Sequence, residues 1–403
     1  SLAVDETAFA FLRLGATRSR PEGVGLIPLR IKRTAASTPA PIVMHGFDDS
    51  ETITLAAGQA HERIVIDVPP NATGLHVTTS GSGEVDLYVA KATATPTPPA
   101  FAAAPARGQA QGTSIHAGAT EAVDLLGAAL TPGRWYITPV NSGSTTATFT
   151  LTSKLDFGAA MARPVMQGYF NPNRSGHGMF LSQVESAWAL VWYTYLEDGT
   201  PTWYLAANAA PAANAGSWRA TLYRLTWNGT VSYSNAVGEV VLTFDSASAF
   251  TFSWLLDGQY GSEPFQTGSG ASCPSVGGTP TSYSGAWANP AESGWGFSVT
   301  AISAVEADAA YLFDAQGVAR WLLGVTTTPG AAVTIPLLQH RGFCPTCAFS
   351  SVTTTQVGTL NRSYTNKANG SVTLDATWQQ GVPGAWTRNN ATQLKITGDM
   401  PCQ

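Results

Sequence analysis

The sequence predicts an all-β protein, in which a jelly-roll-like β-sandwich is followed by two homologous β-sheet repeats, each a sandwich or a barrel. Three observations support this fold class. Charged residues make up only 12% of the 403 residues, about half the share usual in soluble domains. Short stretches rich in Val, Ile, Thr and aromatic residues alternate in polarity between Gly and Pro turns, as strands do. One unit in the second half of the chain occurs twice.

The duplicated unit is marked by a short motif and by single residues farther on. Asn171-Pro172 and Ser175-Gly176-His177-Gly178 match Asn289-Pro290 and Ser293-Gly294-Trp295-Gly296, and Tyr193, Gly199 and Trp203 match Tyr311, Gly317 and Trp321. All of these pairs share one offset of 118 positions, as Asn171 and Asn289 do. A shared offset indicates one supersecondary unit present in two copies.

The chain divides into five predicted segments. Residues 1–41 form an arm with two short strands, Ala8–Leu14 and Val24–Ile31, which buries too little surface to fold alone and is expected to pack on a neighbour. Residues 42–155 alternate as the strands of a β-sandwich do. Residues 156–265 are the first Trp-rich repeat, 266–282 are a linker rich in Gly, Ser and Pro, and 283–403 are the second repeat.

Two resemblances to known families follow from motifs. Segment 45–155 contains Val68-Pro69, the run Gly81–Val89, Glu121, the run Pro132–Tyr136 and a closing strand Ala147–Leu151. On these residues it resembles the bacterial pre-peptidase C-terminal domain, which implies a jelly-roll-like sandwich appended to secreted hydrolases, most often proteases. Segment 166–403 is similar to the Trp-rich repeats with Asn-Pro-x-x-Ser-Gly-x-Gly of secreted bacterial proteins, a similarity that implies no activity.

Glu84 and Asp86 are the candidate metal ligands. The pre-peptidase family usually has Asp where Glu84 stands. The two carboxylates can supply oxygen ligands for calcium, or they form an acidic pair that flanks a turn. We predict no other cofactor.

The four cysteines lie in the last third of the chain, and their even number in a chain of low charge favours disulfides and an oxidising compartment. We predict that Cys273 pairs with Cys402 around the second repeat and that Cys344 pairs with Cys347 locally. The alternative is a metal or redox site at Cys344 and Cys347, with His340 as an extra ligand.

A hairpin is predicted at Asp198-Gly199, where glycine adopts a positive φ cheaply. One face of its first strand is apolar in both copies, with Ala189, Val191, Tyr193 and Tyr195 matching Ala307, Ala309, Tyr311 and Phe313. We interpret this face as the common core. On the opposite face, Trp188, Leu190 and Trp192 match Glu306, Asp308 and Ala310.

This opposite face is expected to meet solvent in the second repeat, because a buried unpaired carboxylate is costly. In the first repeat, Trp188 and Trp192 then form either an aromatic binding platform or a surface that another element covers.

Three further residues, His177, Tyr204 and Trp295, are candidates for ligand binding. His177 stands where the second copy has Trp295, and its place between two glycines predicts a tight turn that presents the side chain outward; the alternative is a structural histidine. Tyr204 matches Leu322. Exposed aromatic side chains suit sugar rings or peptide side chains, and they suit packing within a sheet equally well.

No common catalytic motif is present. The sequence has no Gly-x-Ser-x-Gly elbow, no zinc-protease helix and no phosphate-binding loop. Glu263 and Glu292 would form an acid/base pair if they converged in space. A net charge of −5 gives no footprint for nucleic acid. No apolar run approaches the ~20 residues of a membrane span.

We therefore expect a secreted bacterial protein, extracellular or periplasmic, that binds without catalysis. Its partner would be an extracellular polymer, a protein or a cell surface, contacted through the aromatic face. One alternative is a secreted hydrolase, or the processed C-terminal part of a protease precursor, a reading with which the start at Ser1 is compatible. Another alternative is a structural or adhesive surface protein. We make no prediction of the oligomeric state.

Overall fold

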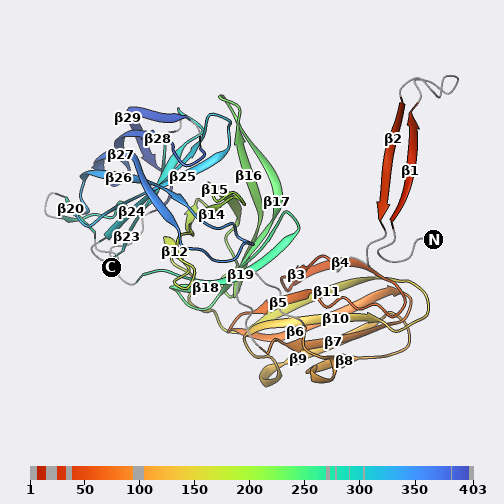
Figure 1. Ribbon diagram of the computed structural model, residues 1–403. Coiled ribbons are helices and arrows are strands. Elements are labelled where there is room, and N and C mark those ends of the chain that lie inside the picture. Colours follow the sequence, from red (N-terminus) through yellow and green to blue (C-terminus); the bar gives the residue numbers. More distant parts are fainter. Residues whose placement is uncertain are drawn as a thin grey trace. The chain divides into compact units, whose positions relative to one another are not determined.

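The computed structural model describes residues 7–14, 25–32, 39–93, 104–268, 273–276, 279–289, 291–302, 305–382 and 384–398. The predicted all-β fold is confirmed (Figure 1): within these ranges the only helices are two short 3₁₀ turns, η1 (Arg107–Gln109) and η2 (Gly127–Ala129). The chain forms two compact units, Ser1–Ala40 and Pro41–Gln403. In the first unit β1 (Thr7–Leu14) and β2 (Gly25–Lys32) pair as an antiparallel hairpin. Packing of this arm on a neighbour stays a prediction.

The second unit begins with a sandwich of two sheets, in the strand orders β3-β5-β10-β7-β8 and β4-β11-β6-β9. Its strands are β3 (Ile42–Met44), β4 (Phe47–Leu55), β5 (Ile64–Val68), β6 (Ala72–Ser82), β7 (Val85–Lys91), β8 (Gly112–Ser114), β9 (Glu121–Leu126), β10 (Gly133–Asn141) and β11 (Ala147–Phe157). Alternate residues point into the space between the sheets; Val85, Leu87 and Val89 on β7 are fully buried there. A jelly-roll-like β-sandwich is thus present as predicted.

The sandwich contacts the first repeat through the outer face of its five-stranded sheet. Val65 and Tyr136 pack there against Val241 and Tyr260. Asp67 accepts two hydrogen bonds from Arg134 at 2.9 and 2.8 Å and one from Ser253 at 2.7 Å. Burial alone would raise the pKa of Asp67, but the charge and hydrogen bonds of Arg134 lower it. A charged pair thus stabilises the contact between sandwich and repeat.

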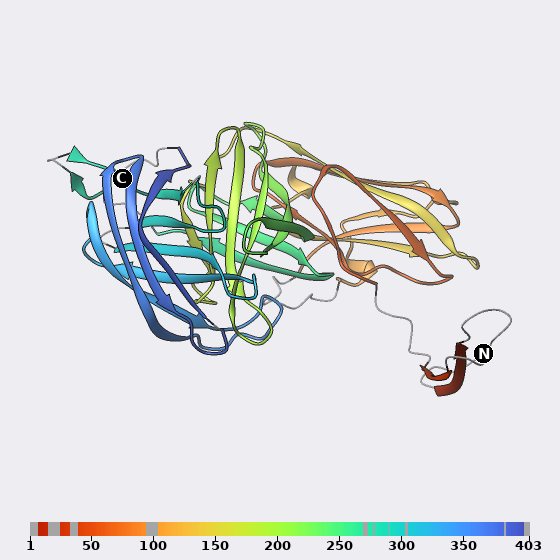
Figure 2. The ribbon, with the colours of Figure 1, turned by 90° about the horizontal axis from the view of Figure 1, so that it is seen from above.

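Each repeat is a closed eight-stranded barrel in which consecutive strands pair (Figures 1 and 2). The first barrel contains β12 (Gly168–Phe170), β13 (Gly178–Val184), β14 (Ala187–Tyr195), β15 (Pro201–Ala209), β16 (Ser217–Trp227), β17 (Ser232–Phe244), β18 (Ala249–Leu256) and β19 (Gln259–Gln266). The second contains β22 (Gly285–Ala288), β23 (Gly296–Ile302), β24 (Val305–Phe313), β25 (Ala319–Thr326), β26 (Ala332–Arg341), β27 (Thr353–Asn366), β28 (Asn369–Thr377) and β29 (Ala385–Lys395). Between them β20 (Ser275–Val276) pairs with β21 (Thr279–Pro280). The two predicted repeats thus share one topology.

Trp188 and Trp192 lie inside the first barrel. They are only 2% and 0% exposed and pack against Trp218, Phe252 and Trp254. The prediction of an exposed aromatic platform is therefore wrong. A closed barrel of eight strands leaves an interior just wide enough for side chains to fill, and here large rings fill it.

Glu306 and Asp308 also lie inside their barrel, each 1% exposed. The prediction that this face meets solvent in the second repeat is wrong, because the carboxylates are not unpaired. Arg362 on β27 donates to Glu306, and its Nε lies 3.2 Å from Asp308 Oδ2. The guanidinium also lies over the ring of Tyr364, at 4.4 Å from its centroid. Burial raises the pKa of Asp308 well above its usual value.

The first barrel carries apolar residues at the same places. Gly238 and Gly358 both lie at an irregularity in the pairing of β17 with β16 and of β27 with β26. Four residues after each glycine stand Leu242 and Arg362. The charged set of Glu306, Asp308 and Arg362 in one barrel thus replaces an apolar set in the other.

We expect Arg362→Leu to lower the free energy of unfolding by about 3–5 kcal/mol, because it leaves two buried carboxylates without their cation. The triple variant Glu306→Trp, Asp308→Leu and Arg362→Leu installs the apolar set of the first barrel and should recover most of that loss. Denaturant titration of both variants measures the difference. A triple variant as unstable as the single one would contradict this account.

A second prediction concerns His76 on the sandwich, whose ring nitrogens lie 2.7 Å from Asp124 Oδ1 and 2.9 Å from Asp156 Oδ2. Hydrogen bonds to Asp156 and Asp124 raise the pKa of His76. Its stabilisation is therefore fully present below the unfolded-state pKa of about 6.5 and is lost as the pH rises through the folded-state value. We expect His76→Gln to lower Tm by about 1–3 °C near pH 5.5 and to have no effect near pH 9. A difference in Tm that is the same at both pH values would refute this assignment.

Candidate functional site

The two barrels pack against each other along a contact that we call the seam. It is formed by Tyr195 and Trp203 of the first barrel and by Ala309, Tyr311, Phe313, Ala319 and Trp321 of the second. These residues include the face that we interpreted as the common core. The interpretation as the core of each repeat is wrong, because this face lies on the outside of each barrel. The packing of the two barrels buries its residues Tyr195, Ala309, Tyr311 and Phe313, while Ala189, Val191, Tyr193 and Ala307 are half-buried.

The seam is nearly symmetric. Trp203 Nε1 donates to the carbonyl of Leu312 at 3.3 Å, and Trp321 Nε1 donates to the carbonyl of Thr194 at 2.8 Å. The two donors are separated by the repeat offset, and so are the two acceptors. The duplicated units therefore bind each other reciprocally, as two subunits related by a twofold axis do.

Glycines at the tips of two hairpins extend the seam. The predicted hairpin at Asp198-Gly199 is confirmed, and Gly199 accepts a hydrogen bond from Gly342 in the other barrel at 3.0 Å. Its counterpart Gly317 accepts one from Trp227 at 2.9 Å. A Cβ at Gly317 would lie 1.9 Å from the Trp227 carbonyl oxygen. Only glycine allows this close approach of the two backbones, which explains why it occurs in both copies.

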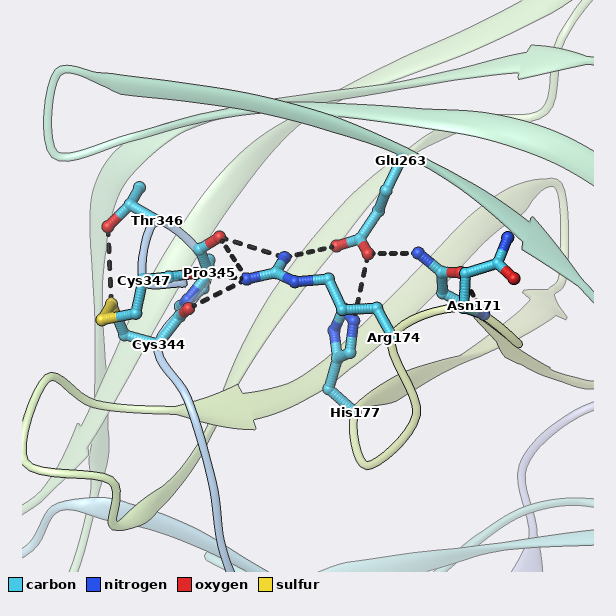
Figure 3. A network of polar contacts seen from close by, with 9 residues as sticks. Asn171, Arg174, His177, Glu263, Cys344, Pro345, Thr346 and Cys347 are labelled. Carbon is cyan, nitrogen blue, oxygen red and sulfur yellow. Dashed lines mark hydrogen bonds and ion pairs between the residues drawn. A yellow bond between two sulfur atoms is a disulfide. The ribbon is translucent and has the colours of Figure 1, made fainter. Parts of the chain in front are cut away.

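One end of the seam is closed by a buried charged network (Figure 3). Glu263 on β19 accepts hydrogen bonds from Asn171 Nδ2 at 2.6 Å, from Arg174 Nη1 at 3.4 Å and from His177 Nε2 at 3.2 Å. The side chains of Glu263 and His177 are fully buried. Three residues of the repeated turn thus hold one carboxylate of the last strand.

Arg174 also binds loop 342–352 of the second barrel, which we call the disulfide loop. Its guanidinium donates to the carbonyls of Cys347 at 2.7 Å, Pro345 at 3.2 Å and Cys344 at 3.4 Å (Figure 3). The predicted disulfide between Cys344 and Cys347 is confirmed, with 4.9 Å between the Cα atoms. These two sulfurs are therefore not thiolate ligands of a metal. Arg174 thereby fastens the disulfide loop over this end of the seam.

At the other end the same pair occurs with reversed charges and remains open. Glu292 replaces Arg174 on the turn, and it lies 3.2 Å from Arg388 on the last strand β29. These side chains are 41% and 39% exposed, whereas those of Glu263 and Arg174 are 0% and 4% exposed. The second copy of the turn is thus accessible to solvent where the first is covered.

A groove of about 500 Å³, the seam groove, lies at this open end. The first barrel contributes Trp227 and Asn228 to its walls, and the second contributes Phe313, Gln316, Trp386 and Arg388. Phe313 stacks on the ring of Trp227 at 5.9 Å, while Gly294 lies against the same indole. Arg388 lies over Trp386, at 4.2 Å from the ring centroid. The groove therefore combines half-buried tryptophans with an accessible guanidinium.

A second hollow, the seam cavity, measures about 260 Å³ and is lined from both barrels. Six of its lining residues are His177, Phe180, Tyr193, Ala307, Trp321 and His340. The ring of His340 stacks on Trp321 at 5.1 Å. Burial lowers the pKa of His340 to about 4, so its imidazole is neutral at physiological pH.

The other predicted ligand-binding residues are less accessible than expected. His177 is 3% exposed and does not present its side chain to solvent, so the prediction of an outward side chain is wrong. Tyr204 is 2% exposed inside the first barrel, with Arg224 over its ring. Trp295 is 7% exposed; its Nε1 donates to Glu292 at 3.3 Å, and its ring contacts Trp386. Of these three residues, only His177 lines the seam cavity. Trp295 contacts the seam groove indirectly, through its packing against Trp386.

The remaining candidates have local partners. Glu84 accepts a hydrogen bond from the Gly118 amide at 2.8 Å, and Asp86 accepts one from Ser142 at 3.1 Å. Among the described residues no group of three or more His, Cys, Asp or Glu side chains could hold a metal ion. Cys273 is disulfide-bonded, but its predicted partner Cys402 lies outside the described residues. Glu263 and Glu292 belong to separate networks.

Sequence reasoning missed the groove residues Trp386 and Arg388. For Trp227 the sequence shows only that it has no aromatic counterpart in the second repeat, since Pro345 stands at the repeat offset. His340 was considered only as a metal ligand. Both hollows combine residues of the two barrels, and the offset does not say which positions of one copy face the other.

In comparisons with known proteins, no family model matches this chain, and no curated protein sequence matches it significantly. In the part of the chain that the structure describes, no helix has the length and apolar character required to cross a bilayer.

We expect Arg174→Met to lower the free energy of unfolding by about 2–4 kcal/mol, because Glu263 would stay buried without its cation and three carbonyls would lose their donor. Denaturant titration measures the loss. Arg163→Met is the matched control, since Arg163 donates one hydrogen bond, to Pro211 at 2.9 Å; it should cost about 1 kcal/mol or less. Equal losses in the two variants would disprove the role of Arg174.

Proposed function

We propose that the protein is a secreted, non-catalytic binding protein that holds a chain of an extracellular polysaccharide in the seam groove. The observation that carries the proposal is the contrast between the two ends of the seam. The turn at Arg174 is sealed by the disulfide loop, whereas the equivalent turn at Glu292 borders an open groove of about 500 Å³. The volume falls within the range of ligand sites.

The chemistry of the groove suits a polymer with hydroxyl and carboxylate groups. Arg388 lies over Trp386. Its Nε lies 3.2 Å from Glu292 and its Nη1 donates to the carbonyl of Thr387 at 2.9 Å, so the 39% exposed guanidinium has its remaining donors for oxygen atoms of a ligand. Gln316 and Ser293 are exposed in the same walls. Trp227 and Trp386 add apolar surface for the C–H groups of a sugar ring.

The compartment is inferred from the disulfide between Cys344 and Cys347, a bond that persists in oxidising environments. The resemblance of the sandwich to the pre-peptidase C-terminal domain supports a secreted bacterial protein. We expected Trp188 and Trp192 to contact the ligand, but they fill the interior of the first barrel. We therefore assign the aromatic contact with the ligand to Trp227 and Trp386.

We expect Arg388→Ala and Trp386→Ala each to weaken binding of an acidic polysaccharide such as alginate or pectate by roughly tenfold or more, because each removes a central contact of the groove. Affinity electrophoresis and calorimetry measure the effect. Binding should also weaken as salt rises, since a guanidinium–carboxylate contact is screened.

Arg107→Ala is the control, because Arg107 also lies over an aromatic ring, that of Tyr88 at 5.9 Å, but on the sandwich. It should leave the affinity unchanged. Thermal melts establish that the groove variants remain folded. The proposal fails if the folded variants bind as the unaltered protein does, or if no acidic or neutral polysaccharide binds the unaltered protein.

A further inference from the structure

The β16–β17 hairpin extends beyond the strands that flank it in the first barrel (Figure 1). β17 pairs with β18 only between Gly238 and Phe244, whereas its pairing with β16 already begins at Ser232. The first five residues of β17, Ser232–Ala236, therefore have a neighbouring strand on one side only, and all of them are exposed. We call this segment the free edge.

The hydrogen bonds of the hairpin determine which backbone groups the free edge offers. The amide of Asn228 donates to the carbonyl of Val231 at 3.2 Å, and along an antiparallel ladder bonded pairs alternate with unbonded ones. Counted from this pair, the N–H and C=O groups of Ser232, Ser234 and Ala236 point away from β16. Among the described residues, these groups have no hydrogen-bond partner. They are free to pair with a strand that approaches from outside.

The backbone groups around the free edge are already paired. Directly after it, the carbonyl of Val237 accepts a hydrogen bond from the amide of Asp257 at 2.8 Å. On the other side of the hairpin, the amide of Trp227 donates to the carbonyl of Gly317 at 2.9 Å, so the second barrel holds β16 there. The free edge is therefore a short segment with defined ends, and it presents three outward residues at regular spacing.

The free edge lacks the features that usually keep exposed strands from pairing. Natural edge strands carry charged side chains or proline, and residues 231–237 include neither. Two large side chains are instead exposed on one face of the strand, Val231 at 51% and Tyr233 at 53%. An uncharged edge with exposed apolar side chains favours pairing with another strand.

We propose that the free edge pairs with the free edge of a second copy of this chain. Ser234 is the middle one of the three outward residues, so an antiparallel pairing centred on Ser234 aligns Ser232 of each copy with Ala236 of the other. Each of the three aligned pairs exchanges two hydrogen bonds, which gives about six across the contact. The outward groups of both edges are thus satisfied without a change in the fold.

The side chains of the free edge fit this pairing. The centred register places Tyr233 beside Asn235 of the second copy, and Val231 beside Val237 of the second copy, on one face of the joined sheet. The exposed apolar surface of Val231 and Tyr233 is then partly covered.

The absence of charge distinguishes a second copy from a partner that is recognised by opposite charge. A twofold axis sets the same edge of both copies side by side, where like charges would repel each other; the free edge has none. The contact is small compared with the interfaces of permanent dimers, so we expect a weak dimer that forms between micromolar and millimolar concentration. This contact does not depend on the polymer proposed for the seam groove.

Sedimentation equilibrium of the full chain tests the proposal, and the average mass should rise from monomer toward dimer with concentration. Ser234→Pro removes the central outward N–H group and inserts a ring into the contact, so it should weaken the dimer at least about tenfold. Ser234→Thr keeps the N–H group and should leave association unchanged. Thermal melts should show both variants folded, because the N–H group of Ser234 does not bind β16.

A charge exchange locates the contact at Ser234 even if Ser234→Pro fails to fold. Ser234 faces its own counterpart in the centred register, so Ser234→Lys and Ser234→Asp should each abolish association by setting like charges opposite each other. An equimolar mixture of these two variants should associate again, because Lys then faces Asp.

The proposal is overturned if the unaltered protein stays monomeric up to millimolar concentration, a result that would leave the free edge to an extended segment of another protein. It is also overturned if either charged variant alone associates as the unaltered protein does. A mixture of the charged variants that associates no more than each variant alone would overturn it as well.

Discussion

The reciprocal packing of two barrels along one seam is the constraint on which the rest of this structure depends. Trp203 and Trp321 each cross the seam to a backbone carbonyl of the other barrel, and the glycines at two hairpin tips allow the backbones to meet. A buried tryptophan adds apolar area to a contact. When its indole N–H also donates a hydrogen bond to a carbonyl of the other surface, it fixes the relative orientation of the two surfaces. Both hollows lie along this contact, and without it neither would have its second wall.

The fold class followed from the sequence because it depends on local patterns. Alternation, turn residues and the repeat offset each report on short stretches of chain, and strands, hairpins and duplication came from them directly. The closed form of each barrel and the face that points inward did not. Alternation says that two faces differ, but it does not say which is inside a barrel and which is covered by another domain.

The faces of Trp188 and of Glu306 were assigned to the outside of their repeats, but both lie inside the barrels. The partners that make this burial possible are distant in the sequence. An unpaired buried carboxylate is indeed costly, yet Glu306 and Asp308 are buried because Arg362 lies between them from a strand more than fifty residues away in sequence. The cysteine pair could be predicted because its members are three residues apart. The groove could not, because Trp227 and Trp386 meet only after two barrels have closed and packed.

The near-symmetry of the seam also bears on how such a protein can change over time. Two identical barrels packed in this way would constitute a homodimer, in which every substitution appears on both sides of the axis at once. Joining the halves in one chain holds them at a high effective concentration. It also allows a substitution in one half to occur without the same substitution in the other. Exchange of Arg174 for Glu292 and of His177 for Trp295 could then turn one of two equivalent ends into a sealed joint and leave its twin open. In a symmetric homodimer, any site at the contact occurs in two identical copies. In a single fused chain, the two ends of the same contact can evolve into two different sites.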